Sequence, residues 1–145
     1  MTEHRLKDYV ATVETRVDSH YPNQVVSLGI IMELFGMAGG KLAYMLDGDA
    51  GLMRAYDNVE FMAPAYQGDY LRVTATLLSV GNTSRRRLYE AHVVARCHGI
   101  GSEPSHGEIL DPPILVARAT GTAVTPLEFQ RHTPADLKGK PRTTA

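Results

Sequence analysis

A single carboxylate inside an apolar stretch is the first feature of this sequence that could do chemistry. Between residues 25 and 45 most positions are apolar or glycine, and Glu33 is the only acidic residue among them. A carboxylate in such surroundings is a candidate general base, because it can accept a proton from a bound molecule. Two structural roles would also explain a carboxylate at this position. Glu33 could form an ion pair with an arginine such as Arg54, or it could lie at an interface between two copies of the chain.

The beginning of this stretch offers groups that stabilise negative charge. Ser27 can cap a helix that starts here, and the backbone N–H groups of Leu28 and Gly29 would then lie at its positive end. Such groups suit an oxygen atom that gains negative charge during a reaction, and Gly29 allows a ligand to approach closely. The alternative is an ordinary capped helix start.

Four polar or aromatic residues precede the helix and could serve a site there. His20 and Tyr21 are candidates for acid or binding groups. Asn23 and Gln24 could hold a carbonyl or amino group through their side-chain amides, or they could simply form a turn.

A second cluster, near the C-terminal third, invites a metal interpretation. It consists of Cys97, His98, His106, Glu108 and Asp111. Their spacing matches no closed zinc pattern, and the segment from 98 to 113 is rich in Gly, Ser, Pro and charge, which is typical of a loop. We therefore expect no metal site.

The elements that must position these residues follow from hydrophobic periodicity. Alternating β-branched and apolar residues predict strands over 9–17, 53–62, 70–80, 83–97 and 114–124, and the continuous apolar pattern predicts a helix over 25–45. Because apolar residues surround the helical wheel, we expect the helix to be buried on nearly all sides. The predicted class is α+β: one domain over 1–125, with a curved antiparallel five-stranded sheet wrapped around a long central helix, and a polar tail with few anchors over 126–145.

Composition excludes several other classes of protein. Fifteen basic and sixteen acidic residues give a net charge of -1, so nucleic-acid binding is not expected. The lone Cys97 and the charged N-terminus argue against disulfides and a signal peptide, and favour the cytoplasm. Glu33, Gly36 and Lys41 interrupt the longest apolar run, so no membrane span is expected. An open sheet edge favours a homodimer or a larger homo-oligomer.

Several short motifs, in this order along the chain, resemble those of one family. The segment 61–71 resembles the turn between the second and third strands of hotdog-fold acyl-CoA proteins. The others together resemble the hotdog-fold 3-aminoacyl-CoA ammonia lyases, over roughly residues 18 to 124. They are Ser19-His20-Tyr21, Asp47-Gly48-Asp49, Tyr56 to Phe61, Val80-Gly81-Asn82, Tyr89-Glu90-Ala91, Asp111 to Leu115, and Arg118 to Gly121.

This resemblance implies the hotdog fold and a reaction. The reaction is the reversible elimination of ammonia from a 3-aminoacyl-CoA, such as 3-aminobutyryl-CoA or β-alanyl-CoA, to give an enoyl-CoA without a metal or organic cofactor. Glu33 would be the base, and the helix N-terminus would stabilise the thioester enolate. His20, Tyr21 and Glu90 are further catalytic candidates.

The same resemblance suggests residues that bind the substrate. Asn23, Gln24, Leu28, Gly29 and Asp47 are candidates for the acyl end, although Asp47 could simply belong to the turn that ends the helix. Arginines suit the CoA phosphates, and the candidates are Arg85, Arg87 and Arg118. Because strand residues alternate between faces, at most two of the run 85–87 can share one site. The loop over 98–113 would cover the acyl or pantetheine end of the pocket.

One departure from the family pattern falls in the helix. Members carry an aspartate after the Phe/Trp-Gly pair, whereas this chain has Met37 after Phe35-Gly36. Glu33 lies one helical turn earlier on the same face, so either the acid has moved by a turn or the activity has changed. A hotdog thioesterase or enoyl-CoA hydratase, and a non-catalytic acyl-CoA-binding protein, are the alternatives.

Overall fold

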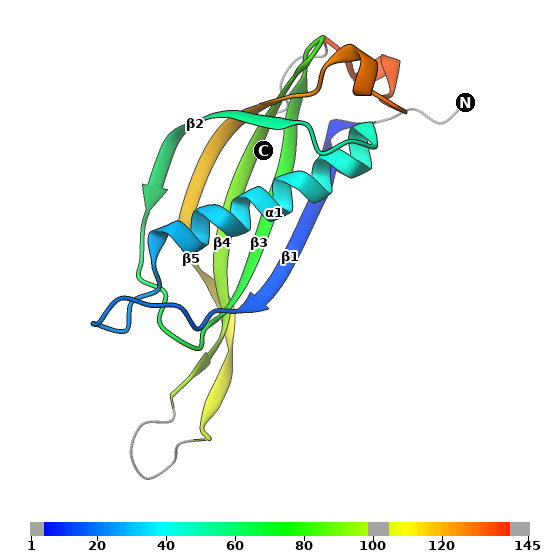
Figure 1. Cartoon of the computed structure of the whole chain (residues 1–145). Coiled ribbons are helices and arrows are strands. Elements are labelled where there is room, and N and C mark those ends of the chain that lie inside the picture. Colours follow the sequence, from blue (N-terminus) through cyan, green and yellow to red (C-terminus); the bar gives the residue numbers. More distant parts are fainter. Residues whose placement is uncertain (1–4, 99–104, 140–145) are drawn as a thin grey trace.

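One long helix lies across a curved sheet in the computed structural model, which describes residues 5–98 and 105–139 (Figure 1). Within these residues the only α-helix is α1. The main elements are β1 Val10–Arg16, α1 Leu28–Asp47, β2 Leu52–Phe61, β3 Tyr70–Val80, β4 Ser84–Cys97 and β5 Gly107–Val124. The five strands form one antiparallel sheet in the order β1-β3-β4-β5-β2, so the α+β expectation is confirmed.

The sheet buries the face toward α1 because its strands alternate as the sequence predicted. Val73 on β3 lies opposite Ala91 on β4, and both are fully buried, whereas Arg72 and Glu90 point to the other face. Phe35 and Leu42 of α1 complete the core from the helix side. This packing fixes which face of α1 remains available for a site.

α1 is not buried on all sides, which corrects one expectation. Its sheet-facing residues are buried, but Met37 and Tyr44 are 55% and 60% exposed, and Glu33 and Lys41 are exposed as well. A single sheet covers only one side of a helix, so these outer side chains stay accessible to solvent, although the Lys41 ammonium donates to the carbonyl oxygen of Thr12 on β1 at 2.9 Å. Ser27 caps the N-terminus, and Gly48 ends the helix with a φ of 71°, where a glycine is favoured.

α1 begins three residues later and ends two residues later than predicted. It has 20 residues and is long and apolar enough to cross a bilayer by length and composition. Its buried side, however, packs against β1, β3 and β4 (Figure 1). We therefore describe it as the core helix of this fold.

β5 begins seven residues earlier than predicted. The segment expected as a loop over 98–113 forms strand from Gly107 onward, while residues 99–104 lie outside the described residues. Pro112 and Pro113 fall at a register shift, since Ile114 pairs with Val93 and Ile109 with Ala95. Prolines lack a backbone N–H, so an irregular ladder at this point accommodates them.

The segment after β5 packs more closely than the sequence suggested. It contains short 3-10 turns at Leu127–Phe129 and Ala135–Leu137, and Leu137 is fully buried in the core. The backbone N–H of Gly139 donates to the carbonyl oxygen of Val80 at 2.7 Å. The expectation of few anchors is therefore wrong for residues 126–139.

Candidate active site at the start of the helix

A groove of about 290 Å³ separates the first half of α1 from the end of β1. Ile30, Glu33, Leu34 and Met37 form the helix wall, and the opposite wall comes from Val13 and residues 15–19. Glu33 and Met37 share this groove, as their spacing predicted. The helix wall is apolar except for Glu33, so the Glu33 carboxylate is the one group on this wall that can exchange a proton.

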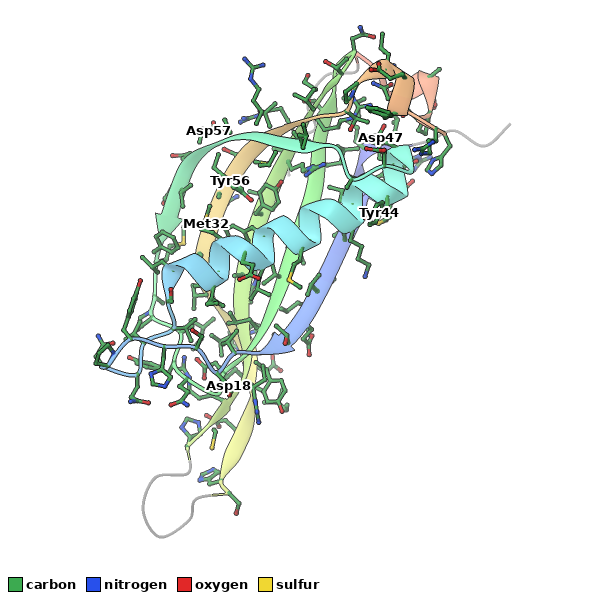
Figure 2. All side chains as sticks on the ribbon, in the orientation of Figure 1. Asp18, Met32, Tyr44, Asp47, Tyr56 and Asp57 are labelled. Atoms are coloured by element: carbon green, nitrogen blue, oxygen red, sulfur yellow. The ribbon has the colours of Figure 1, made fainter. Side chains whose placement is uncertain are left out.

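The carboxylate of Glu33 is unpaired among the residues that the structure describes. It forms no ion pair with Arg54 or any other residue of the described ranges, and its side chain is exposed. The burial that we expected for Glu33 is therefore absent in the single chain. At the mouth of the groove, Arg16 and Asp18 form an exposed ion pair at 3.1 Å, and Figure 2 shows Asp18 near the end of β1.

The helix N-terminus lies one turn before Glu33. The Ser27 hydroxyl accepts the N–H of Gly29 at 3.2 Å, which uses one of the two donors that we predicted for an oxyanion. The N–H of Leu28 is hydrogen-bonded to none of the residues that the structure describes. Leu28, which carries the free donor, lies five residues before Glu33, about 7.5 Å along the axis. One donor and one base thus flank the same turn.

The connection between β1 and α1 brings four more predicted residues to this end. His20 Nδ1 donates to the carbonyl oxygen of Tyr21 at 2.8 Å, and both side chains are exposed. The Asn23 carboxamide oxygen accepts the N–H of Val25, and Gln24 has a φ of 70°. Asn23 and Gln24 therefore form a turn, while all four residues remain close in the chain to the helix start.

Asp69 fixes the neighbouring turn, which belongs to the hotdog-like segment 61–71. This buried carboxylate accepts the N–H of Tyr66 at 2.7 Å and two hydrogen bonds from Arg96, at 3.0 and 2.9 Å. This turn also fixes the β1–α1 connection, because the N–H of Gln67 donates to the carbonyl oxygen of Gln24 at 2.9 Å. The hydrogen bonds of Asp69 therefore support the site, although Asp69 itself does not line the groove.

Glu90 and Arg118 lie on the sheet face away from α1. They are cross-strand neighbours on β4 and β5, and Arg118 Nε lies 3.7 Å from a Glu90 carboxylate oxygen. Within one chain, Glu90 is therefore separated from Glu33 by the sheet. Arg118 remains 48% exposed at its side chain, so it is available to a solvent-borne phosphate.

Asp47 and Arg85 are interior residues, which corrects two binding assignments. Both side chains have 0% exposure, and Arg85 donates Nε and Nη2 to the two Asp47 oxygens at 2.8 Å each. The hydroxyls of Thr125 and Thr133 also donate to Asp47, which lies at the C-terminal end of α1 (Figure 2). A ligand cannot reach this fully partnered pair, so we assign it to folding.

The Asp47 carboxyl is held in its charged form. Burial raises its pKa, but the hydrogen bonds from Arg85, Thr133 and Thr125 and the charge of Arg85 outweigh burial. The pKa of Asp47 therefore lies below its ordinary value.

Arg87 is also buried, with 4% of its surface exposed, so the CoA phosphates cannot reach it from solvent. Strand alternation places Arg85, Arg87 and Tyr89 on the face toward α1 and leaves Arg86 on the outer face, where it pairs with Asp57 at 2.7 Å. The assignment of Arg85 and Arg87 to CoA phosphates is therefore wrong for the single chain.

The candidate metal cluster does not assemble. His98 Nε2 lies 2.7 Å from Glu108, and the His98 and His106 rings are 5.5 Å apart. No group of three His, Cys, Asp or Glu side chains within 5–98 and 105–139 is arranged to hold a metal ion.

Sequence reasoning missed the Arg16–Asp18 pair, which borders the groove. Arg16 is the last residue of β1 and Asp18 lies two positions further on, so their side chains point to one side of the chain. That spacing was the available signal, but only the packing of α1 against β1 places them beside Glu33.

Comparisons with known proteins agree with this architecture. Residues 23–93 match the thioesterase superfamily. Over 116 residues the chain is 42% identical to the 3-aminobutyryl-CoA ammonia lyase of Acetoanaerobium sticklandii, covering 79% of this chain and 90% of that protein. The chain therefore belongs to the hotdog-fold 3-aminoacyl-CoA ammonia lyase family.

Two solved structures extend the comparison. The β-alanyl-CoA:ammonia lyase from Clostridium propionicum superposes with a TM-score of 0.80 at 27% identity, covering 88% of this chain and 92% of that one. The acyl-CoA hydrolase from Staphylococcus aureus, in complex with butyryl coenzyme A, coenzyme A and coenzyme A disulfide, has a TM-score of 0.66 at 17% identity, covering 89% and 71%. The second match supports the fold alone.

Proposed function

We propose that this protein catalyses the reversible elimination of ammonia from a 3-aminoacyl-CoA to give an enoyl-CoA. Its 42% identity to a protein named as a 3-aminobutyryl-CoA ammonia lyase supports the reaction class. The observation that carries the mechanism is the Glu33 carboxylate, five residues along α1 from the Leu28 N–H, with neither group paired to any residue that the structure describes. Elimination next to a thioester needs these two groups.

The chemical steps use the chain's own residues. The thioester carbonyl oxygen accepts a hydrogen bond from the Leu28 N–H, which stabilises the enolate. Glu33 takes the proton from Cα, the electron pair of that bond forms the Cα–Cβ double bond, and the Cβ–N bond breaks. The ammonium substituent leaves as ammonia, and Glu33 releases its proton to water or to ammonia. No metal or organic cofactor is required by this sequence of steps.

His20, Tyr21 and Arg118 are proposed to serve binding. His20 and Tyr21 are exposed beside the helix start, where they can contact the amino group or the pantetheine chain. Arg118 retains solvent access and can pair with a CoA phosphate. Glu90 would then orient Arg118 rather than meet the acyl group.

The reaction itself gives the decisive assay. We expect incubation with crotonyl-CoA and ammonia to produce 3-aminobutyryl-CoA, measured by mass spectrometry, and the reverse reaction to release crotonyl-CoA. Free CoA thiol without the amine adduct would instead indicate a thioesterase, and 3-hydroxybutyryl-CoA would indicate a hydratase. Thermal stabilisation by CoA thioesters without any turnover would indicate a binding protein.

We further propose a homodimer built on β2 and the outer face of α1. β2 is an edge strand of ten residues, and every residue in it except Tyr56 is exposed. The apolar side chains exposed on these two elements are Leu28, Met37, Tyr44, Met45, Leu52, Met53, Val59 and Phe61. A second copy of the chain would pair with the unpaired edge and cover this apolar surface, because a two-fold axis brings identical edges together.

Light scattering after size exclusion tests the dimer. We expect a mass of at least twice the 15.9 kDa chain, and we expect Phe61→Lys on β2 to shift the protein to the monomer. Ile109→Lys is the matched control, since Ile109 is 79% exposed but lies on β5 away from this surface. A monomeric wild type, or a Phe61→Lys protein of unchanged mass, would contradict the proposed interface.

A further inference from the structure

The groove that holds Glu33 continues past this carboxylate toward the middle of α1. α1 and β1 run in opposite directions, so the end of α1 lies near the start of β1 (Figure 1). Residues 15–19 and the first turns of α1 therefore form the near end of the groove, while Val13 and Met37 form its far end. A ligand group that passes Glu33 enters this far part.

The part of the groove beyond Glu33 is apolar. Leu34 and Val17 line it and are buried, with 6% and 4% of their surfaces exposed, so they lie at its base. The hydroxyl of Thr15 is already engaged, since it donates to the carbonyl oxygen of Arg16 at 3.2 Å. These walls suit a hydrocarbon chain better than a polar group, which would lose its hydrogen bonds to water there.

A hydrogen bond between α1 and β1 limits the length of the groove. The Lys41 ammonium donates to the carbonyl oxygen of Thr12 at 2.9 Å. Lys41 lies one helical turn beyond Met37, and Thr12 directly precedes Val13 in β1. The contact therefore connects the two elements just past the last residues that line the groove. A chain that enters from the start of the helix meets a limit at this point.

The size of the groove exceeds that of a short acyl group. At about 290 Å³, and with roughly 30 Å³ for each water-sized atom, it holds about ten non-hydrogen atoms. A 3-aminooctanoyl group has this size, whereas a 3-aminobutyryl group would leave much of the groove to water. The length agrees with the volume. Met37 lies one turn past Glu33, about 6 Å along the axis, which is the span of about five extended carbon–carbon bonds.

We propose that this groove binds the apolar chain of the substrate, which is the CoA thioester of a 3-amino acid with an unbranched chain of about eight carbons. This inference rests on the proposed function. With Cα at Glu33, a chain carried by Cβ extends past Leu34 to Met37 and displaces water from apolar surface. Met37 also belongs to the α1 surface that we assign to the dimer. A second copy would cover its solvent side, and the chain would still reach its groove side from the start of the helix.

Binding of saturated acyl-CoA thioesters tests the groove without relying on turnover, because these thioesters carry no amino group to eliminate. The probes are butyryl-CoA, hexanoyl-CoA, octanoyl-CoA and dodecanoyl-CoA, with free thiol measured to exclude hydrolysis. By titration calorimetry we expect octanoyl-CoA to bind about 15-fold more tightly than butyryl-CoA, since an open groove buries about half of each added methylene. Dodecanoyl-CoA should bind no more tightly than octanoyl-CoA, because the groove ends at the Lys41–Thr12 contact.

Two variants change the far end of the groove from opposite walls. Val13→Phe fills it from β1, and Met37→Asp places a charge in it from α1. Each should lower the octanoyl-to-butyryl affinity ratio to near one and leave the affinity for butyryl-CoA within a few-fold, and light scattering checks that both variants keep the wild-type mass. Val10→Phe is the matched control, because Val10 lies on the opposite face of β1 and is 41% exposed. It should keep the wild-type ratio.

Three results would overturn the assignment. The first is a wild-type octanoyl-to-butyryl ratio below about three, which is less than one buried methylene gives. The second is a ratio that stays unchanged in both Val13→Phe and Met37→Asp. The third is dodecanoyl-CoA that binds more tightly than octanoyl-CoA, because the chain would then lie on a surface without the observed limit.

Amination assays separate this inference from the proposed function. If both hold, trans-2-octenoyl-CoA is aminated with a higher kcat/KM than crotonyl-CoA. Amination of crotonyl-CoA without any preference for the longer chain, in turnover or in binding, would remove only the role of the groove. Binding that depends on chain length without amination of either enoyl-CoA would remove the lyase activity and keep the role of the groove. Failure to bind any of these thioesters would contradict both.

Discussion

Replacing Glu33 by glutamine is expected to lower kcat for ammonia elimination by a factor on the order of 10² to 10⁴, the usual contribution of a general base. Glutamine keeps the shape of the side chain but cannot accept the Cα proton. Because Glu33 forms no ion pair with the described residues, the substitution leaves no buried charge behind. The loss should therefore appear in turnover and not in folding.

The measurement is the steady-state rate of crotonyl-CoA release from 3-aminobutyryl-CoA. Glu14→Gln is the control, since Glu14 is an exposed carboxylate on β1 that pairs with Arg72 at 3.2 Å. It should retain nearly full activity. Turnover by Glu33→Gln within threefold of the wild type would remove Glu33 from the mechanism, and thioester affinity measured by calorimetry should stay within a few-fold in both variants.

Replacing Asp47 by asparagine is expected to lower the free energy of unfolding by about 3 kcal/mol, because it leaves Arg85 charged and buried without its partner. Urea unfolding at pH 7 measures the change. Asp57→Asn is the matched control: Asp57 also pairs with an arginine, but 56% of its side chain is exposed. Its effect should be far smaller, since water screens an exposed pair.

The Asp47–Arg85 pair also makes the free energy of unfolding depend on pH, in a direction that the pKa of Asp47 determines. The folded-state pKa of Asp47 lies below its ordinary value of 3.8. The stabilisation is therefore complete above that value and is lost as the pH falls through the lower, folded-state pKa. The stability difference between wild type and Asp47→Asn should be constant from pH 5 to 7 and should shrink in acid below about pH 4. A difference that grows on acidification would contradict the assignment.

Much of the fold could be predicted because its signals are local. Alternation over β3 and β4 and the continuous apolar pattern of α1 depend only on neighbouring residues, and these elements appear within a few residues of expectation. The early start of β5 was missed because Pro112 and Pro113 are typical of loops. Only pairing with β4, a long-range interaction, makes that segment a strand.

The site was predictable in part, for the same reason. Glu33, Met37 and the helix N-terminus lie within three turns of one helix, so spacing alone places them together. The error over Arg85 and Arg87 was avoidable, since both alternate in phase with Tyr89, Ala91 and Val93, an apolar pattern that indicates the core face of the strand. The partners of Asp47 were not accessible to sequence reasoning, because Thr125 and Thr133 lie some eighty residues away.

The wide separation of the Asp47 partners has a consequence for the order in which the protein matures. Arg85, Thr125 and Thr133 all follow Asp47 in the chain, so its carboxylate has its full set of partners only after residue 133 has been made. Until then the buried carboxylate can pair with Arg85 but lacks the two threonine hydroxyls. Residues 125–137 thus complete the interior at the C-terminal end of α1, and the buried ion pair reaches its final form after the rest of the sheet has been made.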